Sequence, residues 1–198
     1  MDFNGARDYI LQRLDKELNP ALYYHSVAHT KGVWESTLRL AEMEHVGGNE
    51  LKLLETAALF HDSGMLIQYS DHEMTSANLA REILPEFAYA NSEIDLISSL
   101  ILMTRLPQSA KTLLEEILCD ADLDYLGRED FFIHSFELQL EWIHNGIKKT
   151  SFSEWMEVQL QFLSAHQYFT KSAIRLRQEQ KMKNLSEIQK LFNIINYL

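Results

Sequence analysis

The sequence has few of the residues that break or cross-link a chain. Its 198 residues include only 7 glycines, 3 prolines and 1 cysteine. A β-sandwich or barrel needs a turn signal about every 8–12 residues, so this scarcity disfavours both folds. The single cysteine, Cys119, allows no intramolecular disulfide, and such usage is typical of a reducing cytosol. We therefore expect a cytoplasmic protein.

Basic residues and long apolar runs are also scarce, which limits the partners. The chain has 18 Lys and Arg against 29 Asp and Glu, a formal net charge of -11. Nucleic-acid affinity comes mainly from clustered basic residues, so we expect no nucleic-acid polymer as partner. No apolar run approaches the ~20 residues of a membrane span, and the charged residues 1–18 do not resemble a signal peptide. A small phosphorylated substrate, held by a metal or one cationic pocket, stays compatible with this charge, and the oligomeric state is not fixed.

Helical periodicity dominates the rest of the sequence. The pattern predicts an all-α protein, a compact helical bundle, with no repeat and no linker long enough to mark a domain boundary. We expect a single domain over residues 1–198, with a motif core at about 23–127 and C-terminal helices 129–198 packing on it. The predicted helices cover about 3–18, 26–45, 49–62, 71–84, 91–106, 109–126, 129–145, 152–182 and 185–197.

A His-Asp pair ends the third predicted helix. His61 shares an apolar stripe with Leu54, Ala57 and Ala58, and Asp62 follows at once. Burying a carboxylate is costly unless it is paired or coordinates a cation. The pair therefore indicates a cation site, although a core histidine beside a capping aspartate would give the same pattern.

Two more histidines open the second predicted helix. His29 shares a stripe with Val33 and Leu40, and His25 lies four residues earlier, at or just before the helix start. Histidines at this spacing can bind one metal, or one can ligate while the other handles protons. The alternative is two histidines near a helix N-terminus that make ordinary hydrogen bonds and bind no metal.

Three carboxylates crowd the end of the sixth predicted helix. Asp122 lies on an apolar stripe with Leu118 and Tyr125, whereas Asp120 and Asp124 lie on its flank. An inward aspartate needs a partner, and either a buried Arg or Lys or a metal would serve. Together the three segments supply mixed nitrogen and oxygen donors, which suit a catalytic divalent ion better than a closed structural zinc site.

The order His, His-Asp, Asp resembles the HD superfamily of metal-dependent phosphohydrolases over about residues 23–127. Tyr24-His25 with the later His29 is similar to the tyrosine-histidine motif of this family and of its cyclic-nucleotide phosphodiesterase relatives. Residues 57–62, Ala-Ala-Leu-Phe-His-Asp, resemble its second motif, and residues 121–123, Ala-Asp-Leu, its last. The resemblance implies a divalent-metal site with four ligands: His29, His61, Asp62 and Asp122.

The same resemblance implies that His25 protonates the leaving group, so His25 and Asp62 are the expected catalytic residues. Ser26 departs from the pattern, because phosphodiesterases have asparagine there. The repeated aspartates leave the register of the last motif open. We prefer Asp122 to Asp120 as the ligand, on both the apolar stripe and the Ala-Asp-Leu match.

Other residues are secondary candidates. Similar His-Glu segments follow the second motif in predicted HD phosphohydrolases, so His72 and Glu73 could hold a second metal or orient a water. The alternative needs no chemistry, because Asp71 could cap the helix while Glu73 complements its dipole. Two arginines, Arg105 and Arg128, are candidates for bidentate binding of phosphate, although arginines at helix ends are common on protein surfaces.

The expected reaction is hydrolysis of a phosphate ester or anhydride by a metal-activated water, with a nucleotide as the expected substrate class. The sequence does not choose among Mn, Mg, Fe, Ni, Co and Zn, nor between one ion and two. Alternatives on the same scaffold are a dinuclear-metal oxygenase and a small-molecule hydratase. A non-catalytic nucleotide-sensing module is the third.

Overall fold

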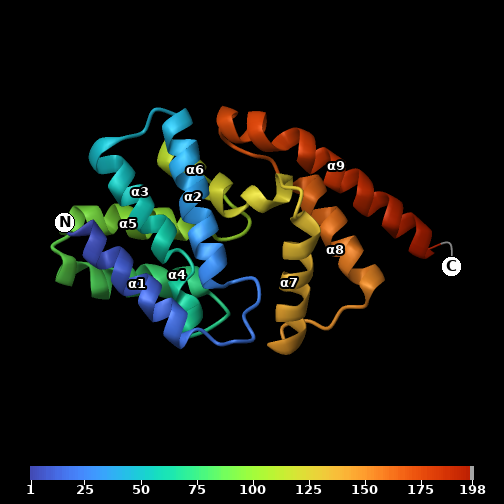
Figure 1. The fold of residues 1–198 in the computed structure, drawn as a ribbon, viewed down its shortest axis with the longest axis horizontal. Helices are drawn as coiled ribbons and strands as arrows, with labels where there is room; N and C mark the ends of the chain where they lie inside the picture. Colours follow the sequence, from blue (N-terminus) through green and yellow to red (C-terminus); the bar gives the residue numbers. More distant parts are fainter. Residues whose placement is uncertain (197–198) are drawn as a thin grey trace. The chain divides into compact units, whose positions relative to one another are not determined.

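A computed structural model describes residues 1–196, and within that range no residue forms a β-strand (Figure 1). The predicted all-α class is confirmed. The α-helices are α1 (Phe3–Glu17), α2 (Val27–Met43), α3 (Gly48–Phe60), α4 (His72–Ile83), α5 (Asn91–Met103), α6 (Leu113–Asp122), α7 (Phe131–His144), α8 (Phe152–Ala165) and α9 (Lys171–Asn196). Short 3₁₀ helices are η1 (Ser63–Leu66), η2 (Leu84–Phe87) and η3 (Asp124–Gly127). No helix in the described range is long and apolar enough to cross a membrane.

The chain forms two compact units. Unit 1 contains residues 1–20 and 25–122, and unit 2 contains residues 21–24 with the described residues from 123 onward. The expectation of one domain, with residues 129–198 packed on the motif core, stays a prediction.

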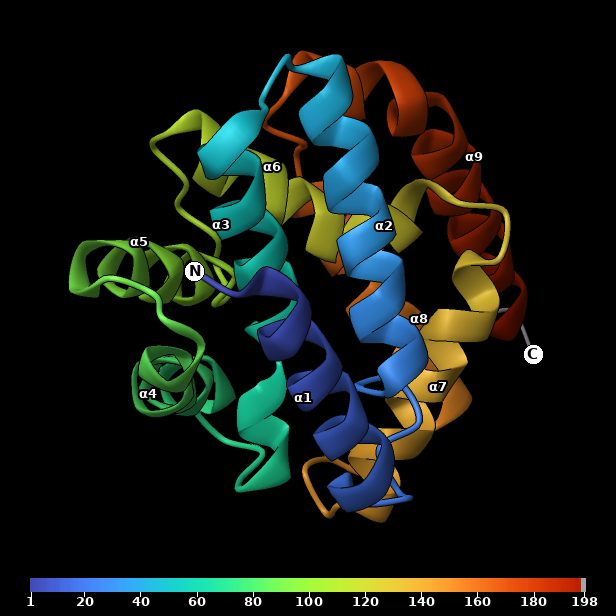
Figure 2. The ribbon, with the colours of Figure 1, turned by 60° about the vertical axis from the view of Figure 1, so that its left-hand side comes forward.

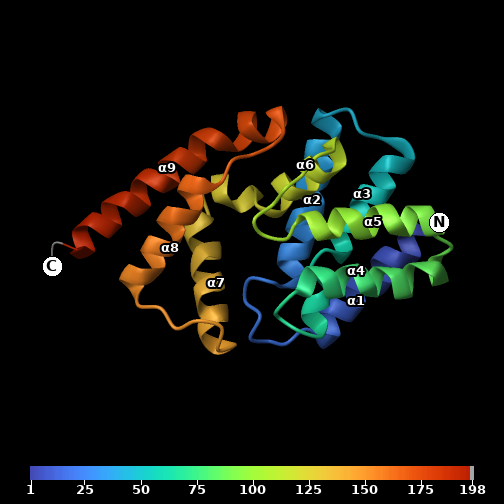
Figure 3. The same cartoon turned by 180° about the vertical axis from the view of Figure 1, so that it is seen from behind.

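Unit 1 is built around α3, which contacts α1, α2, α5 and α6 (Figure 2). Every residue from Leu53 to Phe60 is buried, as expected of a helix that lies in a core rather than on a surface. Leu40 of α2 and Ile97 of α5 are also fully buried. Each such side chain contributes about 1.5–3 kcal/mol when removed from water. The end of α3 is therefore held firmly, and α4 lies beside α5 (Figure 3).

Unit 2 has its own aromatic core. Trp155 of α8 is fully buried and its Nε1 donates to Ser135 Oγ at 3.0 Å. Phe131 of α7 stacks on Tyr125 with ring centroids 6.1 Å apart. Aromatic pairs of this kind add to the free energy gained from area burial.

The sixth helix starts later than the sequence pattern predicts, at Leu113 instead of about residue 109. Glu115 accepts hydrogen bonds from the backbone N–H groups of Lys111 and Thr112, and Thr112 Oγ1 accepts from Glu115 N. This reciprocal cap fixes the first turn. The helix then ends at Asp122, before η3.

The single helix predicted over 152–182 is wrong. α8 ends at Ala165, and His166 has extended backbone angles. α9 starts at Lys171, where Thr170 Oγ1 accepts a hydrogen bond from Ala173 N at 3.1 Å. The threonine cap starts α9 as a new helix after the extended backbone at His166. The helix predicted at 185–197 is part of α9 up to Asn196, and residue 197 lies outside the described residues.

Candidate metal centre

The His-Asp pair lies at the junction of α3 and η1. His61 is the C-cap residue of α3, and Asp62 O accepts a hydrogen bond from Met65 N at 3.0 Å. A Cβ on Gly64 would collide with the carbonyl group of His72, so glycine allows the start of α4 to approach η1 closely. Gly64 N also donates to Ser76 Oγ of α4 at 2.7 Å. This close packing places His72 beside Asp62.

The other two expected ligands come from helix ends that the sequence fixes locally. Ser26 is the N-cap of α2, and its Oγ accepts a hydrogen bond from His29 N at 3.3 Å. The serine that departs from the phosphodiesterase pattern therefore positions the first turn that carries His29. Asp122 is the last residue of α6, which contacts both α2 and α3.

These elements bring the four expected ligands together. The Nε2 atoms of His29 and His61 are 3.3 Å apart, and Asp122 Oδ1 is 3.5 Å from each. Asp62 Oδ2 is 3.3 Å from Nε2 of His29 and 3.1 Å from Nε2 of His61. The donor atoms of His29, His61 and Asp122 all lie within 4.8 Å of one another. They therefore form one group of donors that could hold a metal ion.

The hydrogen bonds around His61 test whether a cation suits this group. His61 Nδ1 is 2.8 Å from the backbone oxygen of Ala58, so its N–H donates there and leaves Nε2 as an acceptor in the neutral ring. Metal-ligating histidines usually donate their other N–H in this way. Asp62 Oδ2 is buried and lies 3.1–3.3 Å from the Nε2 atoms of His61 and His29, so either a proton on one of these rings or a bound cation must satisfy it. Acceptors that converge on a buried carboxylate fit a divalent cation.

Protons partly take the place of that cation in the metal-free protein. Burial alone would lower the pKa of His61, but the charge of Asp62 and hydrogen bonds to Asp122 and Asp62 raise it well above its ordinary value. Burial would likewise lower the pKa of His29, but hydrogen bonds to Asp122 and Asp62 raise it. Burial would raise the pKa of Asp62, yet the charge of His61 holds it well below its usual range. A cation bound here would compete with these protons.

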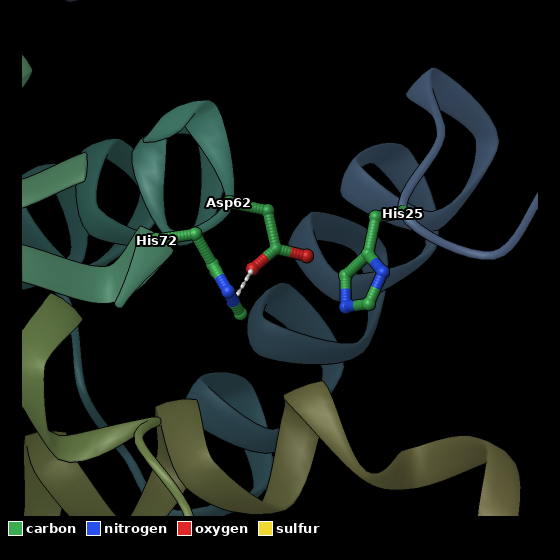
Figure 4. A group of neighbouring side chains, drawn as sticks. All are labelled: His25, Asp62 and His72. Carbon is green, nitrogen blue, oxygen red and sulfur yellow. Dashed lines mark ion pairs between the residues drawn. The ribbon is translucent and has the colours of Figure 1, made fainter. Parts of the chain in front are cut away.

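A second donor group includes Asp62 as well and consists of His25, Asp62 and His72, with the two histidines flanking Asp62 (Figure 4). His72 Nδ1 is 3.0 Å from the backbone oxygen of Tyr69, and its Nε2 is 3.3 Å from Asp62 Oδ1. Glu73 Oε1 is 3.7 Å from the same Nε2. Burial would lower the pKa of His72, but its hydrogen bond to Asp62 raises it to about 9. The two oxygens of Asp62 thus face two different groups.

His25 precedes α2 and lies across from His72 in Figure 4. Its ring centroid is 5.4 Å from that of His72 and 6.1 Å from that of His29. The edge-on ring of Tyr69 is 5.7 Å away. His25 is therefore close enough to act on a group bound at either side of Asp62.

The remaining candidates are not members of the two donor groups. Asp120 is buried, but it belongs to neither group. Arg105 donates to Asp71, and Arg128 of unit 2 donates to Asp130. The structure corrects one alternative, because the Asp71 carboxylate makes no cap hydrogen bond to α4.

The sequence pattern did not indicate Tyr69 or Gly64. Tyr69 lies on the loop before α4, where no periodicity reports on side-chain direction, and its role depends on a backbone oxygen. Gly64 lies where the third predicted helix ends, and the structure shows that it permits the approach of α4. A glycine two residues after the His-Asp pair is the one available signal.

Residues 27–124 match the family model of the HD domain, which confirms the expected resemblance to the HD superfamily. Among curated proteins, an uncharacterized protein of Clostridium beijerinckii is 31% identical over 98 residues, which cover 48% of this chain and 62% of that protein. The match thus spans less than two thirds of the relative's length. The crystal structure of a predicted HD superfamily hydrolase from an uncultured Thermotogales bacterium has a similar fold, with a TM-score of 0.63 at 19% identity. That similarity covers 96% of this chain and 91% of the other.

Proposed function

We propose that the protein is a metal-dependent phosphohydrolase that cleaves a phosphate ester or anhydride. One observation carries the proposal. Two imidazole nitrogens lie within 3.1–3.5 Å of two carboxylate oxygens in unit 1, and the Asp62 oxygen among them is buried. The match to the family model of the HD domain supports the proposal.

The ligands would be His29, His61, Asp62 and Asp122. A divalent ion held by them would lower the pKa of a bound water and offset charge on phosphoryl oxygens. The protein's own contribution is to fix the donors. The backbone oxygen of Ala58 orients the His61 ring, and the Ser26 cap orients the first turn of α2. Mixed nitrogen and oxygen donors accept several metals, so Mn, Mg, Fe, Ni, Co and Zn all stay open.

His25 would donate a proton to the departing oxygen. Its ring lies 5.4–6.1 Å from the rings of His72 and His29, outside the group formed by His29, His61 and Asp122. A proton donor there would be separate from the ligand set and close to the bound phosphate. The resemblance to cyclic-nucleotide phosphodiesterases makes a nucleotide the first substrate class to test.

The second donor group favours one alternative function. His25, Asp62 and His72 could hold a second ion, with Asp62 bridging and Glu73 beside it. In that case His25 would be a ligand and not an acid. Two irons sharing Asp62 would suit oxygenation, the chemistry of the dinuclear-metal alternative.

The test is a screen of purified protein, reconstituted with Mn²⁺ or Fe²⁺, against phosphate monoesters and nucleotides. Turnover that is lost in His61→Ala and kept in His134→Ala supports hydrolysis. His134 is a suitable control because it lies in unit 2, paired with Asp130 and Glu137. Two irons with oxygen consumption would support the oxygenase, and nucleotide binding without turnover would support a sensing module.

A further inference from the structure

The net charge of the protein lies in unit 1. Unit 1 has nine Lys and Arg against twenty Asp and Glu, whereas unit 2 has nine of each. The unit that carries the donor groups therefore accounts for the whole charge of -11. An anionic substrate is repelled by such a surface unless a cation lies near its binding site. A basic side chain beside the donor groups would offset this repulsion.

Among the described ion pairs that Lys and Arg form in unit 1, the one formed by Arg105 is next in sequence to a histidine of a donor group. Arg105 Nη2 lies 2.5 Å from Asp71 Oδ1, and Asp71 directly precedes His72. Consecutive Cα atoms are about 3.8 Å apart, so the guanidinium lies at the edge of the His72 segment. The residue before Arg105 is fixed, because Thr104 is buried and its Oγ1 donates to Ile101 O at 2.8 Å.

Asp71 has an unusual conformation for a residue at the start of a helix. Its φ of 53° and ψ of 34° are left-handed, which few non-glycine residues adopt. Aspartate at an N-cap normally accepts a hydrogen bond from the first turn, and Asp71 does not. Its carboxylate is instead turned to Arg105.

The pair is exposed and therefore easy to open. The side chains of Arg105 and Asp71 have relative accessibilities of 54% and 56%. Exposed ion pairs contribute little to stability, because water and salt screen them. A phosphate offers the guanidinium two or three acceptor oxygens and more charge than one carboxylate. An incoming phosphate group can thus displace Asp71.

We propose that Arg105 binds a phosphate oxygen of the substrate and that Asp71 competes for the same guanidinium in the free protein. This inference rests on the proposed phosphohydrolase function and deepens it. Arg105 is then a substrate-binding residue. Asp71 weakens the affinity for the anion by occupying the guanidinium and by adding a negative charge at the edge of the site.

The kinetic test uses the metal-loaded protein and a matched control pair. Arg81 and Asp95 also form an exposed 2.5 Å ion pair, with side-chain accessibilities of 48% and 65%. Arg81 lies nine residues after His72 on α4, about 13 Å along the helix. We expect Arg105→Ala to raise KM for a phosphate monoester about 10-fold, the size of one charge-assisted hydrogen bond, with kcat nearly unchanged.

Asp71→Asn should lower KM by about 3-fold, because the uncharged asparagine no longer competes for the Arg105 guanidinium and an exposed ion pair is weak. Asparagine tolerates the left-handed conformation, so the fold is kept. Arg81→Ala and Asp95→Asn should leave KM within about 2-fold of the wild-type value, the range left to an exposed pair away from the site. Equal KM changes in the two pairs, or a higher KM in Asp71→Asn, would overturn the proposal.

A binding measurement separates this inference from the proposed function. Inorganic phosphate is titrated into metal-loaded protein by calorimetry, which needs no turnover. Weaker phosphate binding in Arg105→Ala and tighter binding in Asp71→Asn support the role of Arg105 even if no ester is hydrolysed. Phosphate binding by Arg105→Ala that equals binding by Arg81→Ala would overturn the role of Arg105, whatever the enzyme hydrolyses.

Discussion

Replacing Asp122 by asparagine tests the ligand whose register the repeated aspartates leave open. Asp122 Oδ1 lies 3.5 Å from the Nε2 atoms of both His29 and His61. The substitution keeps the size of the side chain and removes its charge. Burial would raise the pKa of Asp122, yet hydrogen bonds to His29 and His61 lower it, so the wild-type side chain is charged at neutral pH. The metal would therefore lose one anionic donor.

The expected loss of metal affinity in Asp122→Asn is estimated from typical losses at metal sites. Loss of an outer partner typically weakens metal affinity 10–100-fold, so loss of a direct ligand should reach about 100-fold. At free metal of about 100 times the wild-type Kd, the wild type gains about 2.7 kcal/mol of stability and the variant about 0.4 kcal/mol. The metal-induced rise in Tm should then differ by about 5–9 °C between them, at ~2–4 °C per kcal/mol for a chain of this size.

Asp120→Asn is the matched control. It makes the same change two residues earlier, at a buried aspartate outside both donor groups. Calorimetric titration with Mn²⁺ should give this variant a Kd within about 3-fold of the wild type, because no direct donor is lost. If Asp120→Asn loses metal affinity and Asp122→Asn keeps it, Asp120 is the ligand and our assignment of the last motif is wrong.

Two further predictions concern protons. His25→Ala should keep its metal and lose about 10²–10⁴-fold in activity on alkyl phosphate esters, but less on nitrophenyl esters, whose leaving group departs without a proton; equal losses on both substrates would contradict acid catalysis. Metal affinity should rise with pH, because the ligands His29 and His61 must lose protons and the protonated ring of His72, whose pKa is about 9 in the metal-free protein, repels a cation held by Asp62. A raised histidine pKa stabilises the metal-free protein below about pH 6.5, and this contribution is lost as pH rises towards 9. The metal-induced rise in Tm should therefore grow between pH 6 and 9, and a constant rise would contradict the competition.

Much of the fold was predictable because apolar spacing reports directly on helices. The stripe that contains Leu54, Ala57, Ala58 and His61 is buried along its whole length. The predicted helix ends were less accurate where side chains form hydrogen bonds with backbone groups. The cap formed by Thr112 and Glu115 has a recognisable sequence, Thr-Leu-Leu-Glu, and would have corrected the start of α6.

The candidate site was predictable in its residues but not in its geometry. Periodicity places His29, His61 and Asp122 on inward faces, and the structure brings these side chains together. It cannot show that the two oxygens of Asp62 face different groups, because that depends on the approach of α4 to η1. The pairing of Arg105 with Asp71 joins residues 34 positions apart, and no local pattern encodes it.

The most direct test of the account is the metal content of purified protein, measured by elemental analysis for the wild type, His61→Ala and His134→Ala. His61 is 1% exposed and its Nε2 faces Asp62 and Asp122, whereas His134 belongs to a surface cluster in unit 2. We predict at least one divalent metal per chain in the wild type and in His134→Ala, and a large loss in His61→Ala with helix content preserved. Normal metal stoichiometry in His61→Ala would contradict the proposed metal centre.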